Sequence, residues 1–193
     1  MPLRLFIALP LPPSARAMLD TYQQSLREAV GDAVRWSPPE QWHLTLRFLG
    51  DVDERLVPDL LRLAERAGGV TPAVAARWLP VADAFPRWTM PQVVWVGLAE
   101  GGQAVARLAE MLERGVVGLG LPAEPRALHP HVTLGRVRST AQARTIGEQL
   151  AGVPDRLGEA PFRLDTVACL RSTLTPRGPI HATLGAFPLA GAP

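Results

Sequence analysis

Two short segments with one residue pattern carry the side chains best suited to chemistry in this 193-residue chain. The segments HLTL and HVTL begin at His43 and His131, and each places a threonine two residues after the histidine. Side chains alternate across a pleated strand, so His43 and Thr45 point to one side, and so do His131 and Thr133. Either segment alone is typical of an ordinary strand with a polar face. The repetition is what predicts a shared site.

Two imidazoles facing one cleft would supply an acid and a base near neutral pH, each contributing about 10²- to 10⁴-fold to a rate. The threonine hydroxyls could donate hydrogen bonds to the non-bridging oxygens of a phosphoryl group. Neither motif contains an aspartate or glutamate, and no His-x-x-x-His spacing occurs, so we expect neither a metal nor another cofactor. Such chemistry suits a strained phosphodiester with an internal leaving group, such as a 2′,3′-cyclic phosphate.

Residues near the first motif are assigned by strict alternation. Arg47 would share the face of His43 and is a candidate phosphate contact, whereas Leu44, Leu46 and Phe48 would point into the core.

A third His-x-Thr pattern begins at His181. A duplicated site has no use for a third copy, so we expect His181 to flank the substrate or to lie on the surface. His129 is expected to serve the turn before the second motif.

Strands and helices are expected to recur in the same order in both halves. Apolar spacing, caps and glycine or proline stops predict the following elements. In the first half, strands are expected at 3–9, at 33–36, in the segment that begins at His43, and at 73–81, with helices at 15–30 and 53–67 and a loop at 83–91. In the second half, strands are expected at 93–98, in the segment that begins at His131, at 161–170 and at 179–186, with helices at 102–116 and 140–151.

The two halves align when the first is shifted by 131 − 43 = 88 positions. The recurring order is strand, helix, His-x-Thr strand, helix, strand, which indicates an internal duplication. We therefore expect one bilobal domain with pseudo-two-fold symmetry, its lobes covering approximately residues 1–91 and 92–193. The two motif strands would then meet at the axis, with His43 and His131 facing each other.

Composition narrows the class of protein. Hydrophobic residues make up 47% of the chain, but no apolar run approaches the roughly 18 residues that a membrane span needs. One cysteine, Cys169, excludes an intrachain disulfide framework, and we expect a cytoplasmic protein without a membrane partner. The net charge of +2 argues against bulk polyanion binding. All 20 basic positions are arginine, so no lysine nucleophile, phosphate-loop lysine or Schiff base is available.

The paired motifs resemble those of the two-histidine phosphoesterase superfamily, and more closely the bacterial and archaeal RNA 2′,3′-cyclic phosphodiesterases, also called 2′-5′ RNA ligases. The flanking segments carry the resemblance over nearly the whole chain: LRLFIAL, RWSPPEQWHLTLRFLGDV, RALHPHVTLGRVR and LRSTLTPRGPIHATLGAFPL. The resemblance implies a bilobal α+β fold with antiparallel sheets lining a central cleft.

The same resemblance implies hydrolysis of RNA 2′,3′-cyclic phosphate ends to 2′-phosphates, with tRNA fragments among the candidate substrates, and reversible 2′-5′ joining as a side activity. Any such joining must be independent of ATP, because nucleotide-activated ligases adenylate a lysine and the chain contains none. It implies His43 and His131 as the acid–base pair, with Thr45 and Thr133 on the phosphate. Arg136 stands where the second family motif carries a phosphate-contacting arginine. Strict alternation would turn Arg136 away from His131, so this role requires a bulge or a strand end.

Two other functions remain open. The same site could act on 2′-5′ oligonucleotides or on nucleotide cyclic phosphates, or the chain could be a non-catalytic module that binds RNA ends. One chain supplies both halves of the site, so we expect a monomer without a stable protein partner.

Overall fold

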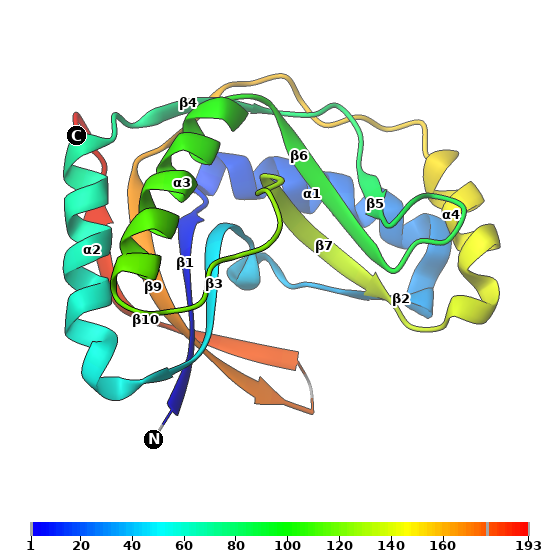
Figure 1. Ribbon diagram of the computed structural model, residues 1–193. Coiled ribbons are helices and arrows are strands. Elements are labelled where there is room, and N and C mark those ends of the chain that lie inside the picture. Colours follow the sequence, from blue (N-terminus) through cyan, green and yellow to red (C-terminus); the bar gives the residue numbers. More distant parts are fainter. Residues whose placement is uncertain (1, 177, 193) are drawn as a thin grey trace.

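Both motif strands lie within antiparallel sheets in the computed structural model, which describes residues 2–176 and 178–192 (Figure 1). The fold is α+β, as expected, and the two sheets contact each other along the motif strands β3 and β7. Among the described residues, no helix is long and apolar enough to cross a membrane.

The first sheet contains His43 and has the strand order β10-β9-β1-β3. Its strands are β1 (Pro2–Pro10), β3 (His43–Asp53), β9 (Thr166–Thr175) and β10 (Gly178–Pro188). Two helices, α2 (Val57–Val70) and α3 (Gly102–Gly118), pack on one face of this sheet and against each other (Figure 1). The other face carries His43.

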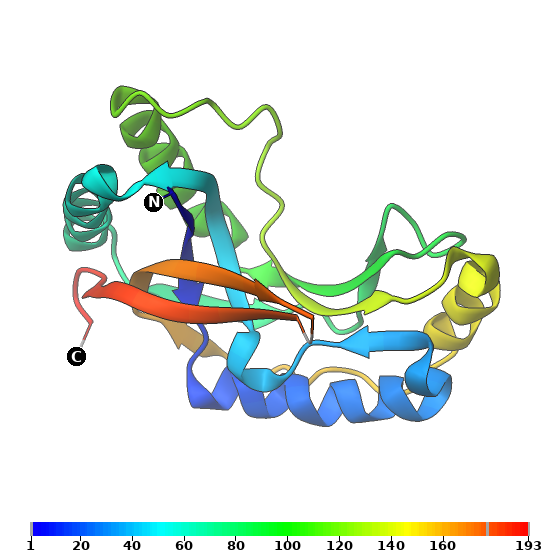
Figure 2. The ribbon, with the colours of Figure 1, turned by 90° about the horizontal axis from the view of Figure 1, so that it is seen from below.

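The second sheet contains His131 and has the order β2-β7-β6-β4-β8, with β5 paired to β6. Its strands are β2 (Val34–Trp36), β4 (Val74–Trp78), β5 (Asp83–Phe85), β6 (Val93–Glu100), β7 (His131–Val137) and β8 (Phe162–Leu164). The helix α1 (Pro13–Val30) runs along this sheet and contacts α4 (Ala143–Ala151) (Figure 2). Short 3₁₀ turns lie at Gly31–Ala33, Pro39–Gln41, Glu54–Leu56 and Thr140–Gln142.

Strands are exchanged between the two halves of the chain. The pairs β3-β1 and β7-β6 are equivalent in the repeat, but β1 pairs next with β9 and β6 pairs next with β4. Each sheet therefore takes strands from the other half, β9 and β10 in the first sheet and β2, β4 and β5 in the second. The expected lobes at 1–91 and 92–193 describe the repeat in sequence, whereas each sheet draws on both halves.

Several element boundaries differ from those expected, and three of the differences have a clear structural reason. The segment 83–91, expected as a loop, contains the short strand β5, whose pairing with β6 supplies order that prolines alone do not reveal. The strand expected at 161–170 is divided into β8 and β9, which belong to different sheets. The helix expected at 53–67 starts as α2 at Val57, because Asp53 caps a 3₁₀ turn first, accepting a hydrogen bond from the backbone N–H of Arg55.

The core lies between each sheet and its helices. In β1, Leu5, Ile7 and Leu9 are fully buried on the helix side. The helices contribute apolar stripes at helical spacing, such as Leu108 and Leu112 of α3. This packing holds β1 and β6 in place, and each of these strands supports one motif strand.

Candidate active site

The two motif histidines have the same local hydrogen bond. Nδ1 of His43 lies 2.7 Å from the backbone oxygen of Gln41, and Nδ1 of His131 lies 2.7 Å from that of His129. A carbonyl oxygen can only accept, so Nδ1 must carry the proton in both rings. In the neutral imidazole, Nε2 is then left with a free lone pair for a substrate or a water. The expected turn role of His129 is thus carried by its backbone oxygen.

Each motif strand bulges directly after its threonine. The register of β3 against β1 shifts between Thr45 and Arg47, and that of β7 against β6 shifts between Thr133 and Gly135. At these two shifts, the residues left without a partner are Leu46 and Leu134, which occupy the same place in the repeat. A bulge inverts the alternation for the residues that follow it.

The bulge turns Phe48 and Arg136 toward the histidine faces. Phe48 pairs with Phe6, and this pair lies on the face of the sheet that carries His43. Arg136 pairs with Val93, and this pair lies on the face that carries His131. The bulge that the role of Arg136 requires is therefore present. The expectation that Phe48 lies in the core is wrong, because 60% of this residue is exposed. Leu44 and Leu46 are buried as expected.

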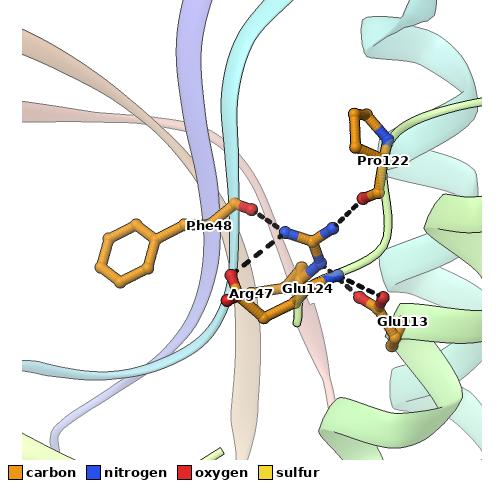
Figure 3. A network of polar contacts seen from close by, with 5 residues as sticks. All are labelled: Arg47, Phe48, Glu113, Pro122 and Glu124. Carbon is orange, nitrogen blue, oxygen red and sulfur yellow. Dashed lines mark hydrogen bonds and ion pairs between the residues drawn. The ribbon is translucent and has the colours of Figure 1, made fainter. Parts of the chain in front are cut away.

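The expectation that Arg47 shares the face of His43 is also wrong. The same bulge turns Arg47 to the opposite face, where it is buried (Figure 3). Its guanidinium forms an ion pair with Glu113 and donates hydrogen bonds to the backbone oxygens of Phe48 and Pro122. A second carboxylate is near, because Oε2 of Glu124 lies 3.7 Å from Nη1 of Arg47. Arg47 therefore fastens β3 to α3 and to the segment that leads into β7.

Aromatic rings surround His43. The ring centroid of Phe6 lies 4.8 Å from that of His43 and 6.1 Å from that of Phe48. His181 meets His43 edge to face at 5.4 Å and Phe6 at 4.9 Å. The third histidine thus belongs to the site rather than to a remote surface, and its buried Nδ1 has no hydrogen-bond partner among the described residues.

His131 has an aromatic environment of its own. Phe85 lies 5.1 Å and Trp95 lies 5.7 Å from its ring, both edge to face, and these two aromatic rings are stacked on each other at 4.6 Å. The imidazole of His129 meets Trp95 at 4.7 Å. Sequence reasoning missed Phe6, Phe85 and Trp95, although Phe6 and Trp95 alternate with buried aliphatic residues on the strands beside the motifs.

Burial lowers the pKa values of the site histidines His43, His131 and His181. Desolvation is the largest cause that lowers the pKa of His43, to about 4, and the nearby imidazoles of His181 and His131 lower it further. The hydrogen bond to Gln41 acts in the opposite direction. Desolvation also lowers the pKa of His131, assisted by His129 and Arg136, and that of His181. The contribution of His131 to the lowered pKa of His43 indicates that the two imidazoles lie near each other.

Metal ligands do not gather at this site. Within residues 2–176 and 178–192, no group of three or more histidine, cysteine, aspartate or glutamate side chains could hold a metal ion. The single thiol, Cys169, is buried in β9, and desolvation raises its pKa to about 11.

The two His-x-Thr strands β3 and β7 thus contact each other within one α+β fold. The sequence-family model of the 2′-5′ RNA ligase superfamily matches residues 10–175, so the chain belongs to this superfamily.

Similar proteins are found along nearly the whole chain. A Thermus thermophilus protein named RNA 2′,3′-cyclic phosphodiesterase is 34% identical, over 98% of this chain and 91% of its own length. The crystal structure of TT0787 from Thermus thermophilus superposes with a TM-score of 0.83 at 32% identity, covering 98% of this chain and 99% of the other. The structure of E. coli LigT complexed with 3′-AMP gives 0.78 at 25% identity, with the same coverage of both chains.

Proposed function

We propose that this chain hydrolyses RNA 2′,3′-cyclic phosphate ends to 2′-phosphates, with His43 and His131 as the acid–base pair. The observation that carries the proposal is the matched pair of Nδ1–carbonyl hydrogen bonds, which leaves Nε2 of each imidazole available. The superfamily and the name of the Thermus thermophilus relative support the substrate class.

The proposed reaction needs one proton acceptor and one proton donor. One Nε2 takes a proton from the attacking water as the new P–O bond forms. The second imidazole, protonated, donates its proton to the 3′ oxygen as the P–O3′ bond breaks. The phosphate then remains on the 2′ oxygen, and no step of this sequence requires a metal.

Charge develops on the non-bridging oxygens during this displacement. Thr45 and Thr133 lie on the histidine faces and can donate hydrogen bonds to those oxygens. Arg136 lies on the same face as Thr133, is exposed, and can add a charge-assisted hydrogen bond. Arg47 has no part in this proposal, because its guanidinium is occupied elsewhere.

The two histidines are not equivalent, and this assigns their roles within the proposal. His43 has a pKa of about 4 and is neutral near pH 7, as a general base must be. Desolvation is the largest cause that lowers the pKa of His131, and His129 and Arg136 add to it. A bound phosphate that neutralises Arg136 would remove one of these additions, and on this ground His43 is proposed as the base and His131 as the acid.

Ligation follows if an RNA 5′-hydroxyl replaces water as the nucleophile. The bond to the 3′ oxygen still breaks, so the product is a 2′-5′ link, and the chain contains no lysine for adenylation. Water is far more abundant than RNA ends, so hydrolysis is the main reaction and ligation the side activity.

Cyclic-phosphate-ended oligoribonucleotides incubated with the protein in EDTA test the main proposal. We expect hydrolysis to 2′-phosphate ends, and a loss of about 10²- to 10⁴-fold in kcat for His43→Ala and for His131→Ala. Activity that disappears with EDTA would contradict the metal-free mechanism. Unchanged cleavage with weakened RNA binding in both variants would favour the binding module, and turnover confined to 2′-5′ linkages would favour the alternative substrate.

A 3′-thio cyclic substrate separates the acid from the base. Sulfur leaves without needing a proton, so this substrate should restore much of the rate of His131→Ala and little of that of His43→Ala. The reverse pattern would exchange the two roles.

A further inference from the structure

Arg35 lies directly opposite Arg136 in the second sheet. The register of β2 against β7 pairs these two residues, so their side chains leave the sheet on the same face. That face also carries His131 and Thr133, because the bulge at Leu134 brings Arg136 to it. Both arginines are exposed.

Two arginines in this arrangement are unfavourable by themselves. Like charges directly opposite each other on neighbouring strands destabilise a sheet. Within residues 2–176 and 178–192, neither Arg35 nor Arg136 has an ion pair, whereas arginines elsewhere do, including Arg62, Arg77 and Arg144. The pair therefore maintains two positive charges beside the site without a neutralising carboxylate.

We propose that Arg35 binds the internucleotide phosphate adjoining the terminal nucleotide, while Arg136 binds the cyclic phosphate. This inference rests on the proposed function and specifies its substrate as an RNA end rather than a mononucleotide. Two phosphates one nucleotide apart supply the two negative charges that two neighbouring guanidinium groups can neutralise.

The order of strands gives each arginine its phosphate. Arg136 lies on the motif strand, and its charge contributes to the lowered pKa of His131. Arg35 lies one strand farther from β6, a displacement of about 4.8 Å, at the edge of the sheet. A nucleoside 2′,3′-cyclic phosphate has only one phosphate and would leave Arg35 unused.

Two substrates distinguish this role from a contact with the reacting phosphate. They are a dinucleotide ending in a 2′,3′-cyclic phosphate and the corresponding nucleoside 2′,3′-cyclic phosphate. We expect Arg35→Gln to lower kcat/KM for the dinucleotide by about 10-fold, as a lost charge-assisted hydrogen bond does, and to leave the mononucleotide unchanged. Equal losses on both substrates, or no loss on the dinucleotide, would overturn the inference.

A neutral methylphosphonate in place of the internucleotide phosphate completes a double-mutant cycle. The kcat/KM of the wild-type protein should be lower for the methylphosphonate than for the natural dinucleotide, by the same factor by which Arg35→Gln lowers kcat/KM for the natural dinucleotide. The kcat/KM of the variant should be the same for both dinucleotides. Additive losses would contradict a direct contact.

Arg66→Gln is the matched control, because it removes one positive charge from an exposed position on α2, the helix that packs on the first sheet. It should leave the preference for the dinucleotide unchanged. If the wild-type protein hydrolyses neither substrate, the proposed function itself fails, which is distinct from a failure of the Arg35 inference.

Discussion

Phe48 and Arg136 occupy the same position of the repeated motif and offer a substrate different chemistry. An equivalent bulge in each motif strand brings the side chain to the histidine face, so the same backbone feature presents an aromatic ring on β3 and a guanidinium on β7. The aromatic ring can pack on an apolar group, whereas the guanidinium can bind an anion. This asymmetry gives the site a direction that the matched histidines lack.

Arg47 is predicted to act on stability rather than on catalysis. Arg47→Met should lower the free energy of unfolding by about 2–4 kcal/mol, because Glu113 and two backbone oxygens lose their shared donor in a buried setting. Denaturant unfolding measures this loss. The kcat/KM of the folded variant should be unchanged, and a lower kcat/KM at full stability would instead support the substrate contact inferred from alternation.

Acidification is predicted to destabilise the protein through the site histidines. The folded pKa of His43, about 4, lies below the ordinary value of 6.5, so the unfolded chain binds more protons between these values. Stability should therefore fall as pH decreases from 6.5 to about 4, with His131 and His181 acting in the same direction. Thermal unfolding across this range should show a smaller pH dependence for His43→Asn, and an equal dependence would contradict the prediction.

At the scale of elements, alternation and helical spacing predict most strands and helices, but they do not predict the bulges. A bulge depends on its partner strand and on distant hydrogen bonds. In β7, the backbone oxygen of Leu134 accepts from the N–H of Ser37 and from Nε2 of Gln23, which is fully buried in α1. These donors lie 97 and 111 residues before Leu134 in the chain (134 − 37 and 134 − 23), so the HVTL segment alone contains no signal for the bulge.

Gln23→Met is predicted to weaken this bulge. The change removes hydrogen bonds of 3.0 Å to the backbone oxygens of Ser37 and Leu134 and should cost about 1–3 kcal/mol. It should also raise KM, since Arg136 is positioned by the bulge. Gln24→Met is the control, because Gln24 is the exposed neighbour on the same helix. Equal effects of the two variants on unfolding and on KM would show that Gln23 does not hold the bulge.

At the scale of the whole molecule, the offset of 88 residues predicts a duplication and the meeting of the two motif strands. The contact of β3 with β7 confirms that the motif strands meet. The offset does not predict the exchange of strands. The order of elements along the chain is the same whether the last strand of each half joins its own sheet or the other one. The sheet that each of these strands joins depends on which apolar faces must be buried, and this is a property of the assembled layers.

This exchange predicts that neither half of the chain folds alone. A fragment of residues 1–91 lacks β9, the second neighbour of β1, and a fragment of residues 92–193 lacks β4, which pairs with β6. Each fragment would expose the apolar side chains that the missing strand covers, and it should show no cooperative thermal transition by circular dichroism. Mixing the two fragments should restore the transition together with cyclic phosphodiesterase activity, because each supplies the strand that the other lacks. A cooperative transition in the first fragment alone would mean that its sheet is sufficient without β9 and β10.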